Sequence, residues 1–261
     1  MHGVELRLPT GEALSLIAKS NLPALVRQEA SILGMLQAHN LMVPQVHYVA
    51  LTPPAYLMMK RIDGQAIFEP GDLAAYVHAM AALLARIHTT PLHREAEAIL
   101  PLGAEVYQQV LDQHADVAQR WIGPAAEPLM QRAWLASPLN QPTLLHGDFW
   151  PGNVLWSEQA IVGVIDWEDA AIGDPLADLA NSRREILWFF GVEAMHQFTE
   201  AYIDHAPALD LTHLPYWDCA TTLFKIEQIA SWCLSPDRQA LFRQRSTWFM
   251  DQAVAALGTS S

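Results

Sequence analysis

The chain has 261 residues, and 15 basic against 28 acidic residues give a formal net charge of −13 with His neutral. Hydrophobic residues make up 51% of it, which is enough for a full core and excludes a disordered protein. A pI near 5.1 argues against a partner that is nucleic acid or an anionic membrane, because both attract basic surfaces. The length fits one large domain or two lobes.

Targeting signals and disulfides are not expected. No apolar stretch reaches about 18 uninterrupted residues and the first residues hold no apolar signal core, so we expect a cytoplasmic protein with no membrane span. Cys219 and Cys233 fall within one predicted helix, where a rise of 1.5 Å per residue would separate them by roughly 21 Å. That distance is too long for a disulfide, so we expect two reduced cysteines.

The first 62 residues have the pattern of a small lobe rich in strands. Asn21 and Pro23 are start signals for a helix, and Pro and Gly mark turns between short apolar runs. The predicted elements, in chain order, are a hairpin of strands 4–8 and 13–18 around a turn at 9–12, a helix at about 25–39, and strands at 45–51 and 55–59.

The remainder, residues 63–261, is predicted to be mainly helical after a hinge at 61–64. Asp72 can cap a helix that runs to His88. Three apolar runs between 143 and 166 form an island of strands and loops among the helices. The fold class is therefore α+β, with a lobe at 1–62 and a helical lobe at 63–261, whose further helices are predicted at 103–121, 125–136, 176–190, 192–205, 215–233 and 237–257.

The segment 146–178 concentrates acidic residues. No Lys or Arg occurs between 133 and 182. Carboxylates that share loops repel one another, and a hard divalent cation such as Mg²⁺ would offset this because it prefers oxygen ligands. The acids of this stretch are Asp148, Glu158, Asp166, Glu168, Asp169, Asp174 and Asp178.

The spacing within this segment is typical of phosphoryl transfer. Asp148 and Asn153 flank a loop tightened by Pro and Gly, and Asp166 follows a later apolar run. In such an arrangement one Asp accepts the proton of the attacking hydroxyl, and the Asn and the second Asp hold the metal that bridges the nucleotide phosphates. The 11 histidines, by contrast, show no H-E-x-x-H spacing of a metal hydrolase.

The chain resembles the aminoglycoside phosphotransferase and choline kinase-like family of small-molecule kinases. It carries that family's pieces in order: H-G-D-x-x-x-x-N at 146–153, I-D at 165–166, G-D-P at 173–175 and D-L-A at 178–180. The resemblance implies a protein-kinase-like fold of two lobes, with nucleotide binding in the first and the catalytic and metal loops in the second. It implies Mg²⁺, and ATP (or GTP) as co-substrate.

The resemblance also assigns roles to residues of the segment. Asp148 would be the catalytic base, and Asn153 and Asp166 the Mg²⁺ ligands. The other three matching residues would support these loops through hydrogen bonds: His146, Asp174 and Asp178.

The nucleotide contacts of the first lobe follow from the same resemblance. Such kinases pair a strand Lys with a Glu of the next helix. Of the three lysines, Lys19 is the best placed, with Glu29 as its partner, and Lys60 is the alternative phosphate ligand. Backbone groups near Met59 and Arg61 would meet the adenine at the hinge.

One departure from the family concerns the first lobe, which is shorter than expected and has no Gly-rich loop. The family has another strand and a glycine-containing loop before the predicted hairpin, whereas this chain starts almost at that hairpin. Two explanations stay open: a start codon further upstream, or real loss of the loop. The second would favour an inactive pseudokinase that senses or binds nucleotide.

The acceptor would be a hydroxyl of a small molecule, such as an aminoglycoside, choline or ethanolamine, or another amino-alcohol or sugar. The acidic bias of the chain favours a cationic acceptor. Candidates for its pocket are Phe149, Trp150, Glu168 and Asp169. Aromatic residues of the helical lobe form either a wall for a cation or plain core: Trp188, Phe189, Tyr202, Trp217, Trp232 and Trp248.

Overall fold

The structure is a computed structural model that describes residues 2–7, 13–92, 94, 98–131 and 133–258. Its contacts divide the chain into two compact units. The predicted boundary at residue 62 assigns residues 151–170 to the second lobe, whereas the contacts group them with the first unit. The first unit comprises Met1–Glu69, Thr90–Leu100 and Pro151–Ala170, and the second comprises Pro70–Thr89, Pro101–Trp150 and Ala171–Ser261.

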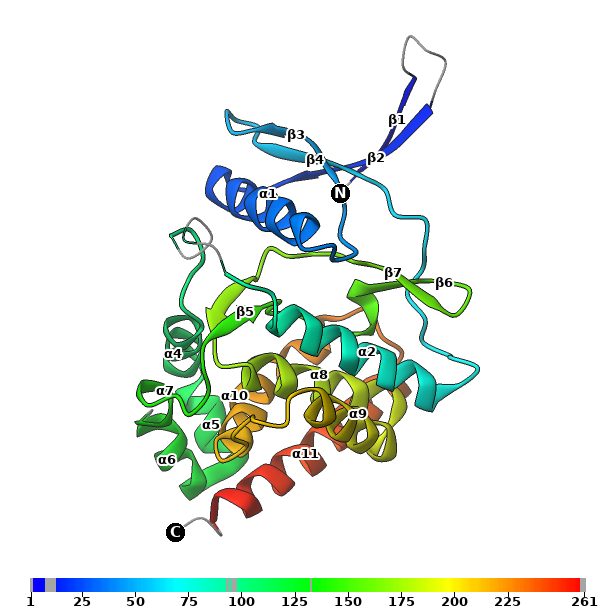
Figure 1. Ribbon diagram of the computed structural model, residues 1–261. Helices are drawn as coiled ribbons and strands as arrows, with labels where there is room; N and C mark the ends of the chain where they lie inside the picture. Colours follow the sequence, from blue (N-terminus) through cyan, green and yellow to red (C-terminus); the bar gives the residue numbers. More distant parts are fainter. Residues whose placement is uncertain (1, 8–12, 93, 95–97, 132, 259–261) are drawn as a thin grey trace. The chain divides into compact units, whose positions relative to one another are not determined.

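The first unit contains a four-stranded antiparallel sheet of order β1-β2-β4-β3, with helix α1 alongside it (Figure 1). The predicted hairpin forms, with His2 opposite Ala18 and Arg7 opposite Ala13, while its predicted turn at 9–12 lies outside the described residues. The elements are β1 (His2–Arg7), β2 (Ala13–Ser20), α1 (Pro23–Ala38), β3 (Val46–Ala50) and β4 (Tyr56–Lys60).

The apolar side of α1 explains how this sheet is covered. Val26, Ile32, Leu33 and Leu36 recur at helical spacing and are almost fully buried, as is Leu57 of β4. Residues at this spacing lie on one face, so the helix buries a continuous stripe. Pro23 stands at the start of the helix, where its missing N–H costs no hydrogen bond.

A second, two-stranded ribbon completes the first unit. β6 (Val154–Ser157) follows a short 3₁₀ turn at Pro151–Asn153 and pairs antiparallel with β7 (Ala160–Val164). The Val164 amide donates to the Met42 carbonyl, 2.7 Å away, which ties the ribbon to the segment after α1. The ribbon therefore places Asn153 at its start and Asp166 just beyond its end.

The second unit is mainly helical, as predicted. Asp72 caps α2 (Leu73–His88) by accepting from the Ala75 amide at 2.9 Å. The short strand β5 (Thr143–Leu145) pairs antiparallel with β8 (Ala171–Gly173), a strand that the apolar pattern did not predict. The long helices α8 (Leu176–Phe190), α9 (Val192–His205), α10 (Leu214–Ile226) and α11 (Pro236–Gly258) pack on one another, and α2 packs on α9 (Figure 1).

Three predicted helices are broken in the structure. The helix predicted at 103–121 divides at His114 into α4 (Gly103–Gln113) and α5 (Ala115–Ile122), and the ring Nδ1 of His114 lies 2.8 Å from the Val110 carbonyl. The helix predicted at 125–136 is replaced by a 3₁₀ turn and two short helices. These are Gly123–Ala125, α6 (Ala126–Gln131) and α7 (Ala133–Ala136).

The third broken helix corrects the argument about the cysteines. α10 ends at Ile226, and a 3₁₀ turn at Gln228–Ser231 follows, so Cys219 and Cys233 do not share one helix. Both are free, Cys219 buried and Cys233 exposed. Among the described residues, no helix combines the length and the apolar character that crossing a bilayer requires.

Candidate functional site

A buried lysine is the centre of the candidate site in the first unit. The Lys19 ammonium lies 3.1 Å from Glu29, 2.5 Å from Asp166 and 3.1 Å from Glu168. The Asn21 side chain donates to Glu168 at 3.0 Å. Lys19 comes from β2, and Glu29 from α1, while both of the other acids follow β7. The predicted Lys19–Glu29 pair therefore forms, and two further carboxylates join it.

The cluster has more negative than positive charge. Burial disfavours the charged ammonium, but hydrogen bonds and charges from Asp166 and Glu29 outweigh it and raise the pKa of Lys19. Burial raises the pKa of Glu29, and Lys19 only partly opposes this. One ammonium faces three carboxylates, so further positive charge would stabilise the cluster.

Asp166 adopts an unusual backbone conformation. Its φ of 67° lies in the left-handed region, which costs of order 1 kcal/mol or more for a residue with a side chain. The neighbouring Ile165 amide donates to the Asn153 carbonyl at 3.0 Å. The strained residue therefore presents its carboxylate to Lys19 from a position beside Asn153.

A pocket of about 190 Å³ adjoins this cluster within the first unit. Its lining includes apolar side chains as well as the charged residues of the cluster. Every residue predicted to bind nucleotide lines it: Lys19, Glu29, Met59 and Arg61, together with Ile17, Pro44, Lys60, Ile62, Leu155, Ile165 and Asp166.

The predicted metal ligands have the chemistry that Mg²⁺ requires, since Asn153 and Asp166 both offer oxygen. Asn153 is buried and Asp166 partly exposed. Among the described residues, no group of three or more His, Cys, Asp or Glu could hold a metal. An ion at these two residues would thus complete its shell with phosphate and water oxygens, as Mg²⁺ does in phosphoryl-transfer sites.

In the second unit, Asp178 of α8 holds the loop that carries Asp148. Its carboxylate accepts from the His146 amide at 2.6 Å and from the Gly147 amide at 2.9 Å. Gly147 has a φ of 83°, which glycine adopts without steric cost. The Asp148 amide donates to the His146 ring at 3.3 Å. These bonds are those expected of residues that support the loop.

Two buried side chains, His88 and Tyr202, hold Asp178 in position. Its Oδ2 lies 3.2 Å from His88 Nε2, and His88 Nδ1 lies 2.5 Å from the Tyr202 hydroxyl. Burial alone would raise the pKa of Asp178, but hydrogen bonds and charges from His88 and His146 lower it. Asp174, the other supporting residue, accepts from the Asn140 side chain at 3.1 Å and from the Leu176 amide at 3.0 Å.

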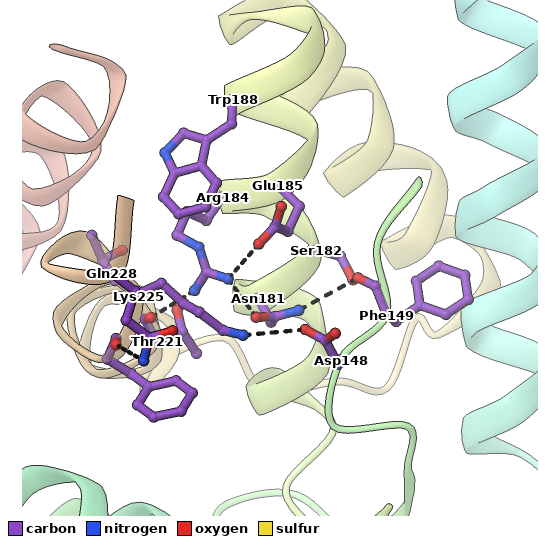
Figure 2. Close-up of polar contacts among 12 residues, drawn as sticks. Asp148, Phe149, Asn181, Ser182, Arg184, Glu185, Trp188, Thr221, Lys225 and Gln228 are labelled. Carbon is purple, nitrogen blue, oxygen red and sulfur yellow. Dashed lines mark hydrogen bonds and ion pairs between the residues drawn. The ribbon is translucent and has the colours of Figure 1, made fainter. Parts of the chain in front are cut away.

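A second pocket, of about 350 Å³, adjoins Asp148. Lys225 of α10 points toward Asp148, with 3.6 Å between the ammonium and Oδ1 (Figure 2). Their side chains are 21% and 24% exposed, so both remain reachable. The pocket is lined by Asp148, Trp150, Glu185, Phe189, Lys225, Trp232, Leu234 and Phe242.

Glu185, one of the two acids that line this pocket, is already paired. Arg184, fully buried, donates to Glu185 at 2.8 Å, to Asn181 at 2.6 Å and to the Thr221 carbonyl at 2.6 Å (Figure 2). Its guanidinium also lies over the Trp188 ring. Burial raises the pKa of Glu185, and Arg184 opposes this.

The four residues predicted to line the acceptor pocket do not lie together in the structure. Trp150 lines the pocket with Asp148 and stacks on Phe189. The Phe149 side chain is fully buried instead, and its carbonyl accepts from Ser182 at 3.0 Å. Glu168 belongs to the Lys19 cluster, and Asp169 is an exposed residue of the first unit.

The six aromatic residues predicted to form a wall for a cation also have different positions. Three of them are core residues with at most 3% exposure: Trp188, Tyr202 and Trp217. Phe189 and Trp232 line the Asp148 pocket. Trp248 is partly exposed and is not among the lining residues. A wall of all six therefore does not form.

Sequence reasoning missed Lys225, Glu185 and Arg184. A signal for Glu185 was present, because polar residues recur at positions 178, 181, 182 and 185, which is the spacing of one helix face. A polar stripe on a helix rich in apolar residues indicates a buried network. Lys225 carried no such signal, since it is a single lysine near the end of a helix.

Comparison with known proteins identifies the family. Residues 7–212 match the profile of the phosphotransferase enzyme family. The chain belongs to this family. An aminoglycoside 3'-phosphotransferase of Escherichia coli is 29% identical over 165 residues, which cover 58% of this chain and 58% of that protein. The mouse acyl-CoA dehydrogenase family member 10 is 34% identical over 124 residues, or 44% of this chain, which spans only 11% of that protein.

Solved structures show the same fold. The amicoumacin kinase hAmiN, in complex with AMP-PNP, Ca²⁺ and Ami, superposes with a TM-score of 0.69 at 16% identity, covering 95% of this chain and 84% of that one. A ternary complex of aminoglycoside phosphotransferase APH(4)-Ia with ADP and hygromycin B gives 0.65 at 17% identity, covering 98% and 94%. The predicted protein-kinase-like fold and phosphotransferase family are confirmed, and the pseudokinase alternative gains no support.

Proposed function

We propose that this phosphotransferase-family chain transfers the γ-phosphate of ATP to a hydroxyl of a small molecule. The observation that carries the proposal is the Lys19 ammonium, held by Glu29 and Asp166 at one end of a pocket with apolar walls. An ammonium suits nucleotide phosphates and an apolar wall suits a purine ring. The surplus carboxylates of this cluster favour a divalent cation beside them.

The phosphoryl group passes directly from ATP to the acceptor, and the protein forms no covalent bond with it. The acceptor oxygen forms a bond to the γ-phosphorus, the bond from that phosphorus to the β–γ bridging oxygen breaks, and its electron pair leaves with ADP. The hydroxyl proton passes to the Asp148 carboxylate, which has the accessibility that this requires. Asp178 holds the loop backbone, so that the base is positioned before the acceptor binds.

Magnesium is part of the same proposal. Asn153 and Asp166 would hold it, and when bound it would neutralise charge on the phosphates. Lys19 holds Asp166 in place through its ammonium, and Glu29 orients that ammonium from α1. These contacts keep the carboxylate from turning away from the phosphate side of the pocket.

The first test is thermal unfolding with ATP or GTP, with and without Mg²⁺. A ligand at about 100 times its Kd adds roughly 2.7 kcal/mol of stability, which raises Tm by several degrees for a chain of this length. We expect a shift with ATP and Mg²⁺ that is lost on adding EDTA. The Asp166→Asn variant should lose the Mg²⁺-dependent part, whereas Asp204→Asn, an exposed change on α9, should keep it. Absence of any nucleotide shift in the folded wild type would contradict the proposal.

A further inference from the structure

The pocket beside Asp148 has a different character from the chain as a whole. Five of its eight lining residues are apolar or aromatic: Trp150, Phe189, Trp232, Leu234 and Phe242. These come from the loop after β5, from α8, from the segment after α10 and from α11. A ligand bound against such a wall is stabilised because its apolar surface is removed from water. The wall offers few hydrogen-bonding groups to a ligand that is heavily hydrated.

The acids that line this pocket are paired with cations, although the chain has a net charge of −13. The two acids of the lining each have a cationic partner: Lys225 lies 3.6 Å from Asp148, and Arg184 lies 2.8 Å from Glu185. A third cation, Arg238, lies over the ring of Phe189, 5.2 Å from its centre. Of these three cations only Lys225 lines the pocket, while Arg184 and Arg238 contact other lining residues.

This arrangement disfavours a ligand with several ammonium groups. Such a ligand would meet Lys225 at the position where its reacting hydroxyl must approach Asp148. Like charges at short range weaken binding, and the acids already have partners that the ligand would need to displace. The local charge therefore argues against the cationic acceptor expected from the net charge.

We propose that the acceptor is a hydroxyl compound with an apolar ring or chain that is uncharged or carries one negative charge, and that Lys225 is the residue that selects it. The proposal rests on the proposed kinase function, since it names the acceptor class of that site. The apolar part lies against the aromatic wall, the hydroxyl reaches Asp148, and an anionic group of the acceptor is attracted by the Lys225 ammonium.

Three compounds with one ring system and different charge test the proposal: 4-(hydroxymethyl)benzoate, benzyl alcohol and 4-(aminomethyl)benzyl alcohol. Their Kd values are measured by ligand-observed NMR on the full chain with ADP and Mg²⁺. We expect the benzoate to bind best and the amine worst, by about tenfold between these two, with hygromycin B as a polycationic competitor that fails to displace the benzoate. Turnover, followed as ADP release with ATP, should show the same order.

Substitution of Lys225 decides whether this residue sets the order. Lys225→Glu should reverse the order of the anionic and cationic compounds. Lys225→Gln, which is less disruptive to folding, should bring the benzoate to the level of benzyl alcohol. Arg27→Glu changes the net charge by the same amount at an exposed position of α1, and should leave the wild-type order.

The outcomes separate this proposal from the proposed function. A chain that binds ATP with Mg²⁺ but prefers the amine or hygromycin B overturns the acceptor class and leaves the kinase function standing. An equal loss for all three compounds in Lys225→Gln would show that Lys225 does not select the acceptor. A folded chain without nucleotide binding would contradict the kinase function, while the order of the three Kd values still decides the preference of the pocket.

Discussion

The two pockets of this chain use the same kinds of side chain but pair their charges differently. In the first unit, one buried lysine, Lys19, serves three carboxylates, and two further cations, Lys60 and Arg61, line the same pocket. In the second unit, Asp148 and Glu185 each have a cationic partner, and Arg238 adds a third cation over the aromatic wall. The buried Lys19 cluster therefore favours a further cation beside it, whereas the second pocket places acids that already have cationic partners beside an aromatic wall.

The difference shows what net charge can and cannot predict. A formal charge of −13 describes the average surface and its long-range attraction, while a pocket responds to the few groups within several ångströms. Positive residues are scarce in the chain, yet Lys225 lines the Asp148 pocket, and Arg184 and Arg238 contact other residues of its lining. The charge of the acceptor must therefore be inferred from the residues around the pocket and not from the net charge of the chain.

The largest expected effect is on turnover when the proposed catalytic base, Asp148, is replaced. Asp148→Asn keeps the size of the side chain but cannot accept a proton, so kcat should fall by about 10²- to 10⁴-fold, the usual contribution of a positioned base. Nucleotide affinity should change little, because the charged cluster of the first pocket is untouched. Single-turnover phosphorylation and nucleotide titration measure the two quantities separately.

The matched control for this variant is Asp204→Asn, at an exposed position of α9. It makes the same chemical change away from both pockets and should retain wild-type turnover. If Asp148→Asn turned over its acceptor at the wild-type rate, the assignment of the base would be wrong.

A smaller effect is expected when Lys19 of the first pocket is replaced, and it should lower both nucleotide affinity and the free energy of unfolding. Lys19→Met removes the one ammonium between three carboxylates and leaves Glu29 buried without its counter-charge. We expect a loss of about 3 kcal/mol in the free energy of unfolding, since breaking one partner of a buried pair typically costs this much. The affinity for ATP with Mg²⁺ should fall at least about tenfold, which corresponds to losing a charge-assisted contact to phosphate.

Two further variants sharpen this comparison. Glu29→Gln removes one of the surplus charges, so its loss of stability should be smaller than that of Lys19→Met. Lys60→Met tests the alternative phosphate ligand, an exposed lysine at the end of β4, and should lower nucleotide affinity far less. A greater loss of affinity in Lys60→Met than in Lys19→Met would exchange their assigned roles. Denaturant unfolding and nucleotide titration are the measurements.

Much of this fold was predictable because local patterns determine it. The spacing of apolar residues predicted α1 and α2, and Asp72 marked the start of α2 correctly. Prediction failed where a break has no strong local signal: His114 interrupts one helix with neither Gly nor Pro at the break. Strand β8 was missed because three residues carry too little pattern, and its pairing with β5 joins segments far apart in the chain.

For the sites, motif spacing predicted which residues would carry the chemistry, but not which partners surround them. The Lys19–Glu29 pair could be expected from a strand lysine and a helix glutamate. The approach of Lys225 to Asp148 could not, because it depends on how α10 packs against α8 and on the path of the loop after β5. The charge of the second pocket was thus hidden from the sequence.

The smallest effect concerns the carboxylate that supports the Asp148 loop. Asp178 differs from the acids of both pockets, since its charge is used by two backbone amides and His88 within the fold. Asp178→Asn should lower the free energy of unfolding at pH 7 by about 2 kcal/mol, the scale of a lost hydrogen bond to a charged group. Turnover should fall less than in Asp148→Asn, because the Asp148 carboxylate itself remains.

The pH dependence distinguishes this charge effect from simple loss of packing. The folded pKa of Asp178 is lowered, so its stabilisation is fully present above the unfolded Asp pKa of about 3.9 and is lost as the pH falls through the folded value. The difference in unfolding free energy between wild type and Asp178→Asn should therefore shrink as the pH falls below about 4. A difference that stayed the same across this acid range would mean that the amide disturbs packing, and that the ionised carboxylate contributes little to holding the Asp148 loop.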